Sequence, residues 1–340
     1  MFSWNATQRP IVALAPMAGV TDAAYRQLIK ELAPDAVVYS EFLSTDAIHY
    51  GAKKTMGMMY FDPKKERPFI VQIFGKDPEH FLSAAKVVEE MGADGIDINM
   101  GCPAARVTSS CHGSALMKNP ELACELVRST KEAVKIPVSV KTRLGWVSPD
   151  ELIPFCTKLV DAGADALAIH GRTYSQKYSG SADWNPIYEL KKQVDVPVIG
   201  NGDIKNAQDA IDKLKNLDGV MIGRGTFGNP WVMKDVCQAM EHCESQVTGH
   251  RSQDFRHATC DMRHLVPTID KLTFEQKIPL IIHHCELAVE LKGEKRGMLE
   301  MRKHLASYVK GIDGAKELRA RLVRVETVDN VKEILIKLQS

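Results

Sequence analysis

The feature that most constrains the fold is a regular alternation of short apolar runs with amphipathic stretches. The apolar runs, rich in β-branched residues, cover residues 11–15, 36–39, 69–74, 95–98, 137–141, 164–169, 197–200 and 219–222. Most are followed by a helical pattern, as in residues 78–91, 121–134, 150–162 and 206–214. Short continuous apolar strands that alternate with helices are typical of a parallel sheet built from strand–helix units.

The number of these units favours a closed barrel. Eight of them end near residue 240, which matches a (β/α)8 TIM barrel, for which about 250 residues is typical. A doubly wound open sheet is the alternative, but it would usually carry a G-x-G-x-x-G turn after the first strand, and none is present. We therefore predict an α/β protein with a catalytic barrel over residues 1–240.

The pattern changes after residue 240. Residues 241–270 are polar, rich in His and Cys, and predict an irregular linker. Residues 273–292, 297–310, 315–325 and 328–338 have helical spacing, which predicts a smaller all-helical domain over residues 271–340. Residues 251–340 carry 17 Lys and Arg against 13 Asp and Glu, a weak indication of an anionic partner. His257, Cys260 and His264 match no standard zinc spacing, so we expect no metal site.

Composition and cysteine usage indicate the compartment. The chain is 44% hydrophobic and 26% charged, as in an ordinary soluble protein. Its first residues lack the apolar core of a secretory signal, and no apolar run approaches membrane-spanning length. We expect a cytoplasmic protein whose eight cysteines are free thiols.

Polar or conformationally special residues follow every predicted strand, and a barrel would bring them onto one rim. Each segment could have a purely structural explanation by itself. Because all eight predicted strands are followed by such a segment, the pattern indicates a site at the carboxyl ends of the strands, where barrel enzymes place their chemistry. The segments are Pro16–Ala18, Ser40–Glu41, Gln72–Gly75, Asn99–Cys102, Lys141–Arg143, His170–Arg172, Asn201–Asp203 and Gly223–Arg224.

Cys102 is a reactive type of side chain at one of these strand ends. Gly101 and Pro103 cannot continue a strand, so the thiol lies where a strand gives way to a Gly- and Ser-rich loop. The alternative is a buried cysteine that acts only as a small hydrophobe.

Two further segments predict an anionic ligand. The glycine-rich turns at Asn201–Asp203 and Gly223–Gly225 follow the seventh and eighth strands, the common phosphate site of this fold, and Arg224 adds charge. Their alternative is a pair of tight turns with a surface arginine. Lys141 in a barrel mouth suggests a charged or electron-rich ligand, and with His170 could serve a flavin. His170 could equally be a buried, hydrogen-bonded histidine.

Together these residues resemble the bacterial-type, FMN-dependent tRNA-dihydrouridine synthase family over nearly the whole chain. The most specific match is Asn99-Met-Gly-Cys-Pro103 with Gly113-Ser-Ala-Leu116 downstream. The other matching segments are Ala15–Asp22, Gln72–Gly75, Lys141–Trp146, His170–Thr173, Asn201–Ile204, Ile222–Arg224, Met301–His304 and Tyr308–Gly311.

The resemblance implies an oxidoreductase that uses FMN and NADPH to reduce the C5–C6 double bond of particular uridines in tRNA. It implies that Cys102 is the general acid that protonates C5. The implied substrate contacts are Asn99, Arg143, His170 and Arg172. The implied FMN contacts are Pro16, Met17, Ala18, Gln72, Lys141, His170, Asn201, Gly202, Asp203, Gly223 and Arg224.

Family members hold tRNA with the helical domain, and we expect a monomer with no membrane association. The resemblance implies tRNA phosphate contacts at Arg302, Lys303, His304, Lys310, Arg319, Arg321 and Arg324. The chain departs from the family at Cys111, at Tyr174 and in the long segment 241–271. Two other functions stay open: an FMN barrel that acts on a free pyrimidine, and a tRNA-binding protein without catalysis.

Overall fold

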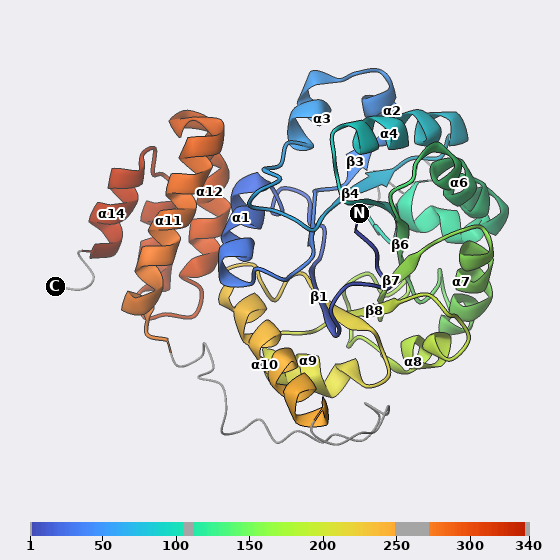
Figure 1. Cartoon of the computed structure of the whole chain (residues 1–340). Coiled ribbons are helices and arrows are strands. Elements are labelled where there is room, and N and C mark those ends of the chain that lie inside the picture. Colours follow the sequence, from blue (N-terminus) through green and yellow to red (C-terminus); the bar gives the residue numbers. More distant parts are fainter. Residues whose placement is uncertain (1, 105–111, 249–271, 337–340) are drawn as a thin grey trace.

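The computed structural model describes residues 2–104, 112–248 and 272–336. A parallel β-barrel surrounded by helices forms the larger part, and a bundle of C-terminal helices packs on one side of it (Figure 1). The predicted fold class, a (β/α)8 TIM barrel with a smaller helical C-terminal region, is confirmed.

Eight parallel strands form the barrel wall. They pair in the order β1-β9-β8-β7-β6-β5-β4-β2, and a bridge between Ala13 and Val37 joins the first strand to the residue before β2. A short additional strand, β3 (Leu43–Ser44), pairs with β4. The wall strands are β1 (Ile11–Leu14), β2 (Val38–Tyr39), β4 (Phe69–Phe74), β5 (Gly95–Met100), β6 (Val138–Arg143), β7 (Ala166–His170), β8 (Val198–Asn201) and β9 (Gly219–Ile222).

Helices cover the outside of this wall, and several begin at a side-chain cap followed by proline. Asp77 and Asn119 accept hydrogen bonds from the first turns of α4 and α6, each of which has proline in that turn. The helices are α1 (Ala23–Leu32), α2 (Thr45–His49), α3 (Lys53–Met58), α4 (Pro78–Glu90), α6 (Pro120–Ala133), α7 (Leu152–Asp161), α8 (Asn185–Lys191), α9 (Ala207–Leu214) and α10 (Trp231–Thr248), with 3-10 turns η1 (Gly113–Lys118) and η2 (Pro149–Glu151).

An apolar cluster fills the inside of the barrel, and two of its members, Ala15 and Met221, also line the cavity at the strands' carboxyl ends. Trp4, only 2% exposed, packs there with Phe2 at a ring-centroid distance of 5.0 Å. The other members of this cluster are Ile11, Ala13, Ala15, Val37, Tyr39, Ile70, Ala166, Ala168, Ile199 and Met221. The N-terminal residues therefore close one end of the barrel.

The C-terminal helices are α11 (Phe274–Lys292), α12 (Glu294–Tyr308), α13 (Ala315–Leu322) and α14 (Val328–Ile336). In Figure 1 they lie beside α1, and the apolar core runs continuously from the barrel helices into them. Four buried rings lie at this contact: Tyr25, His284, His304 and Tyr308, which we call the helix–barrel joint. Tyr25 donates to the carbonyl of Thr226 at 2.6 Å, and Nδ1 of His284 lies 3.0 Å from the Tyr308 hydroxyl.

Some boundaries differ from the sequence prediction. β5 extends to Met100 and β6 to Arg143, so Lys141 lies within a strand and not at its end. α10 continues to Thr248, past the predicted limit at residue 240. Residues 249–271, with His257, Cys260 and His264, lie outside the described residues, and the division into domains stays a prediction. No helix in the described part of the chain has the length and hydrophobicity needed to cross a membrane.

Candidate active site

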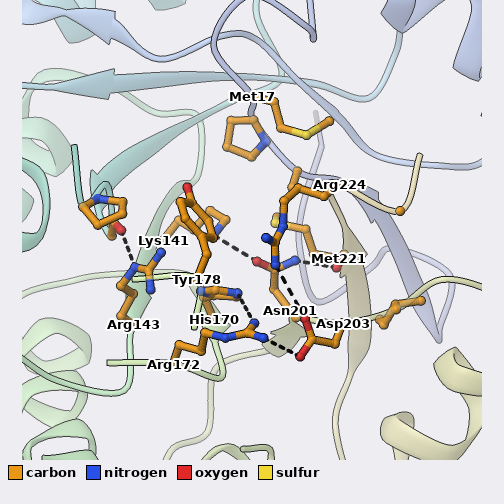
Figure 2. A pocket seen from close by; sticks show the side chains of 18 of the residues that line it. Met17, Lys141, Arg143, His170, Arg172, Tyr178, Asn201, Asp203, Met221 and Arg224 are labelled. Carbon is orange, nitrogen blue, oxygen red and sulfur yellow. Dashed lines mark hydrogen bonds and ion pairs between the residues drawn. The ribbon is translucent and has the colours of Figure 1, made fainter. Parts of the chain in front are cut away.

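A cavity of about 800 Å³ opens where the barrel strands end (Figure 2). Of the residues predicted from sequence, all but Ala18 line it: Pro16, Met17, Gln72, Asn99, Cys102, Lys141, Arg143, His170, Arg172, Asn201, Gly202, Asp203, Gly223 and Arg224. The structure thus brings these residues together, whereas their individual roles stay predictions.

The cavity is strongly cationic. Lys141, Arg143, Arg172, Lys205 and Arg224 line it, against Asp203 as the one acidic lining side chain among the described residues. Concentrating five basic groups around a partly enclosed volume is unfavourable unless anionic groups enter it. The wall is therefore suited to a ligand that carries negative charge.

Lys141 on β6 is held by an amide side chain from β8, two strands along the barrel wall. Its Nζ lies 3.3 Å from Oδ1 of Asn201, and Nδ2 of Asn201 donates to the carbonyl of Met221 at 2.7 Å. Because that carbonyl takes the amide N–H, the oxygen of Asn201 must face the lysine. Burial lowers the pKa of Lys141, and the charge of Arg143 lowers it further, while Asp97 opposes both.

His170 is neutral in this environment. Burial lowers its pKa to about 2, and the neighbouring cations Lys141, Arg143, Arg172 and Arg224 act in the same direction. Nη1 of Arg172 lies 3.5 Å from Nε2 of His170 (Figure 2). The imidazole can therefore orient a bound group by hydrogen bonding, but it does not supply a positive charge.

The turn after β8 is built around Asp203. Its carboxylate accepts from Nη2 of Arg172 and from the amide of Ala182, both at 2.7 Å. Burial tends to raise the pKa of Asp203, but these hydrogen bonds outweigh it and the pKa is lowered. Gly202 and Asp203 have φ values of +131° and +52°, and a Cβ on Gly202 would lie 2.8 Å from Ala182 Cβ.

Cys102 is held by its backbone on both sides. Its amide donates to Oδ1 of Asn99 at 3.0 Å, as does the amide of Gly101, and its carbonyl accepts from Oγ of Ser114 at 2.9 Å. The Asn99 and Ser114 side chains therefore fix the backbone on both sides of the cysteine. The thiol itself lies at the cavity wall and is half-buried.

Several residues at the site had no role assigned from the sequence, among them Lys205 in the cavity lining and three others described next. Asp97 is fully buried beneath the cavity, Ser114 supports Cys102, and Tyr178 lies between Arg143 and Arg224, with guanidinium-to-ring distances of 5.5 and 4.7 Å. The only sequence signal for Asp97 was a carboxylate inside an otherwise apolar strand. Ser114 stood in a motif, and Tyr178 had no signal.

One predicted contact is wrong, that of His304. Ala18 does not line the cavity, although Met17 and Pro16 do, and its predicted cofactor contact stays a prediction. His304 is 2% exposed in the helix–barrel joint, so it cannot contact a tRNA phosphate. Lys303, Lys310, Arg319, Arg321 and Arg324 are exposed, and Arg302 is half-buried with its Nε donating to the carbonyl of Val325. Cys111 lies outside the described residues.

Comparison with known proteins agrees with this architecture. The sequence model of the dihydrouridine synthase family matches residues 13–340. A probable tRNA-dihydrouridine synthase 1 of Synechocystis sp. is 37% identical over 95% of this chain and 85% of its own length. A probable tRNA-dihydrouridine synthase of Rickettsia bellii is 33% identical, with coverages of 96% and 94%. The tRNA-dihydrouridine synthase B of Xanthomonas axonopodis pv. citri is 35% identical, with coverages of 94% and 90%.

The fold and site thus define a barrel enzyme with a cationic cavity at the carboxyl ends of its strands. The chain belongs to the dihydrouridine synthase family.

Proposed function

We propose that the protein is a tRNA-dihydrouridine synthase, an FMN-dependent oxidoreductase that uses NADPH to reduce the C5–C6 double bond of specific uridines in tRNA. The observation that carries the proposal is that Cys102, several basic residues and glycine-rich turns line one cavity in a member of this family. The relatives' names support the tRNA substrate.

The residues around the cavity suit FMN. Its volume of about 800 Å³ falls within the usual range for cofactor sites. Arg224 and the glycine-rich turns after β8 and β9 offer charge and closely approaching backbone to a phosphate. Lys141, Gln72 and Asn201 offer polar atoms to the ring system. When bound and reduced, the flavin supplies a hydride to C6 of the uracil.

The remaining chemistry belongs to the chain's own side chains. Cys102 holds the proton for C5 at the cavity wall, as a general acid. Asn99, Arg143, His170 and Arg172 orient the base. Nε and Nη1 of Arg143 already donate to the carbonyls of Gly101, Thr173 and Lys177. Nη2 makes no hydrogen bond to the described residues, so it is available to a ligand.

The target base must leave the folded tRNA to reach the cavity, because a base in a stack does not expose both faces. The exposed basic side chains of α12, α13 and the segment after them would contact phosphates. We expect the protein to act as a monomer in the cytoplasm, where tRNA and NADPH are both available.

The test is dihydrouridine formation on an unmodified tRNA transcript with FMN-loaded protein and NADPH. Cys102→Ala should keep flavin and tRNA binding and lose about 100-fold or more of the rate, the usual contribution of a general acid. Cys124→Ala, at a buried thiol of α6 outside the cavity, is the matched control and should keep the rate. Equal rates for wild type and Cys102→Ala would remove Cys102 as the acid. Reduction of free uridine but not of tRNA would favour a small-pyrimidine reductase instead.

A further inference from the structure

Asp97 is a buried carboxylate that does not reach the cavity. It lies on β5 with no exposed surface, and it is level with Gln72 on β4 and Ser139 on β6 in the strand register. Oδ2 accepts from Nε2 of Gln72, and Oδ1 accepts from Oγ of Ser139, both at 2.7 Å. A carboxylate buried this deeply costs several kcal/mol unless it is compensated, so its presence asks for an explanation.

The hydrogen bonds of Asp97 continue to Cys102. Oε1 of Gln72 accepts from Nδ2 of Asn99 at 2.9 Å. Oδ1 of Asn99 then accepts from the amides of Gly101 and Cys102, both at 3.0 Å. One chain of hydrogen bonds therefore runs from the floor of the site to the backbone of the cysteine.

The direction of this chain follows from the chemistry of its first member. A carboxylate can only accept, whereas a primary amide has one donating and one accepting end. Asp97 therefore requires the nitrogen of Gln72 to face it, which turns the oxygen of Gln72 toward Asn99. Asn99 must then present its nitrogen to Gln72 and its oxygen to the backbone of Cys102. If either amide turned over, its oxygen or nitrogen would meet a like group.

We propose that Asp97 is a positioning residue, which fixes the orientation of Gln72 and Asn99 and through them the backbone of Cys102. Its role is thus to hold the thiol in place without contact with substrate or cofactor. The inference rests on the proposed function, because its first readout is turnover at Cys102.

A competing role for Asp97 is that of a counter-ion to Lys141. The charge of Asp97 does raise the pKa of Lys141, against the larger effect of burial. The two roles make different demands. A counter-ion must be charged, whereas the orienting role needs only an acceptor that faces Gln72.

Two substitutions separate these roles. Asp97→Asn removes the charge but can still present an amide oxygen to Gln72, with its nitrogen toward Oγ of Ser139. Asp97→Leu removes charge and acceptor together and keeps the branching at Cγ, but leucine is the larger side chain. Asp97→Ala is a second variant without an acceptor, in case the leucine does not fit. Ser139→Ala removes a hydrogen bond from the side of Asp97 that faces away from Gln72, and it is the matched control.

We expect Asp97→Asn and Ser139→Ala to keep kcat for tRNA to within about fivefold, and Asp97→Leu to lower it about 100-fold, as small misplacements of reacting groups do. KM for tRNA should change little, because the RNA-binding surface is untouched. The rate of alkylation of Cys102 by iodoacetamide, measured with the other cysteines mapped by peptide analysis, should change in Asp97→Leu and not in Asp97→Asn.

Other outcomes would overturn the proposal. If Asp97→Asn were as slow as Asp97→Leu, the charge of Asp97 would matter and not the direction of the hydrogen bonds through Gln72 and Asn99. If Asp97→Leu kept both kcat and the alkylation rate, Cys102 would not depend on the chain. If Asp97→Leu and Asp97→Ala failed to fold while Asp97→Asn folded, Asp97 would serve stability alone. Absence of dihydrouridine with wild-type protein would count against the proposed function only, because the alkylation pattern does not need turnover.

Discussion

The cavity and the helix–barrel joint both bury polar side chains, but the groups that surround those side chains differ between the two regions. In the joint, His284 and His304 lie among tyrosines, and their ring centroids are 4.8 Å apart. In the cavity, His170 lies among four cations and next to open volume. Both regions hold neutral histidines, so a buried histidine alone does not mark a functional site. The distinguishing feature of the cavity is an excess of charge that the chain itself does not neutralise.

The largest effect that separates the two regions should come from Lys141→Met. This change removes a half-buried cation that lines the cavity, so we expect a loss of about 100-fold or more in the rate of tRNA reduction, comparable to the loss of an electrostatic group at an active site. The melting temperature should not fall, because the lysine is itself costly to bury. Stopped-flow reduction and thermal unfolding measure the two quantities. Lys158→Met, at an exposed pair with Glu121, is the control, and an equal loss there would argue against a specific role.

The histidines of the helix–barrel joint should instead make the free energy of unfolding depend on pH. Burial lowers the pKa of His284 to about 4. Because the unfolded chain binds its proton near pH 6.5, His284 contributes stability above that pH, and the contribution is lost as pH falls toward 4. At pH 5 the loss is about 2 kcal/mol relative to pH 8.

Urea unfolding of wild type and His284→Gln at pH 8 and pH 5 measures this contribution. The free energy of unfolding of the variant should depend less on pH than that of wild type. Identical pH dependence in the two proteins would mean that folding does not lower the pKa of His284. Flavin binding at pH 8 should be the same in both.

A smaller effect is expected from Arg224→Ala. Arg224 is 58% exposed and its nearest acidic partner, Asp203, lies 3.6 Å away, so its charge is largely available to a ligand. We expect about a tenfold weaker affinity for FMN, corresponding to about 1.4 kcal/mol, with a steeper loss at low salt than at high salt. Fluorescence titration of the apoprotein measures it. Arg296→Ala on α12 is a suitable control, and unchanged affinity in Arg224→Ala would place the phosphate elsewhere.

The smallest effect should be that of Tyr25→Phe in the joint. It removes the hydroxyl that donates to the buried carbonyl of Thr226, which should cost about 1–2 kcal/mol of stability. The turnover rate should stay within experimental error, in contrast to Lys141→Met. A fall in kcat without a fall in the unfolding midpoint would show that the joint is coupled to the chemistry.

The strand–helix alternation and the rim residues were predictable because both follow from local patterns. Strand register then brought Lys141 level with Asn99 on the neighbouring strand, as barrel geometry requires. The orienting role of Asp97 was not predictable, because it depends on the rotamers of Gln72 and Asn99 on adjacent strands. The burial of His304 was missed because Tyr25 and His284, which cover it, are far away in the sequence. The basic residues beside His304 in the sequence suggested that its side chain is exposed and contacts a phosphate, but tertiary packing buries it.

The N-terminal residues that fill the far end of the barrel have a consequence for the order of events. Phe2 and Trp4 close that end within the described part of the chain, so the cavity is reached from the side of the strands' carboxyl ends. An electron donor and a tRNA that both need this cavity would have to enter it through the same opening. We expect them to bind one after the other: the donor binds, reacts and dissociates before the tRNA binds. Double-reciprocal plots of the steady-state rate should then show the parallel lines of ping-pong kinetics.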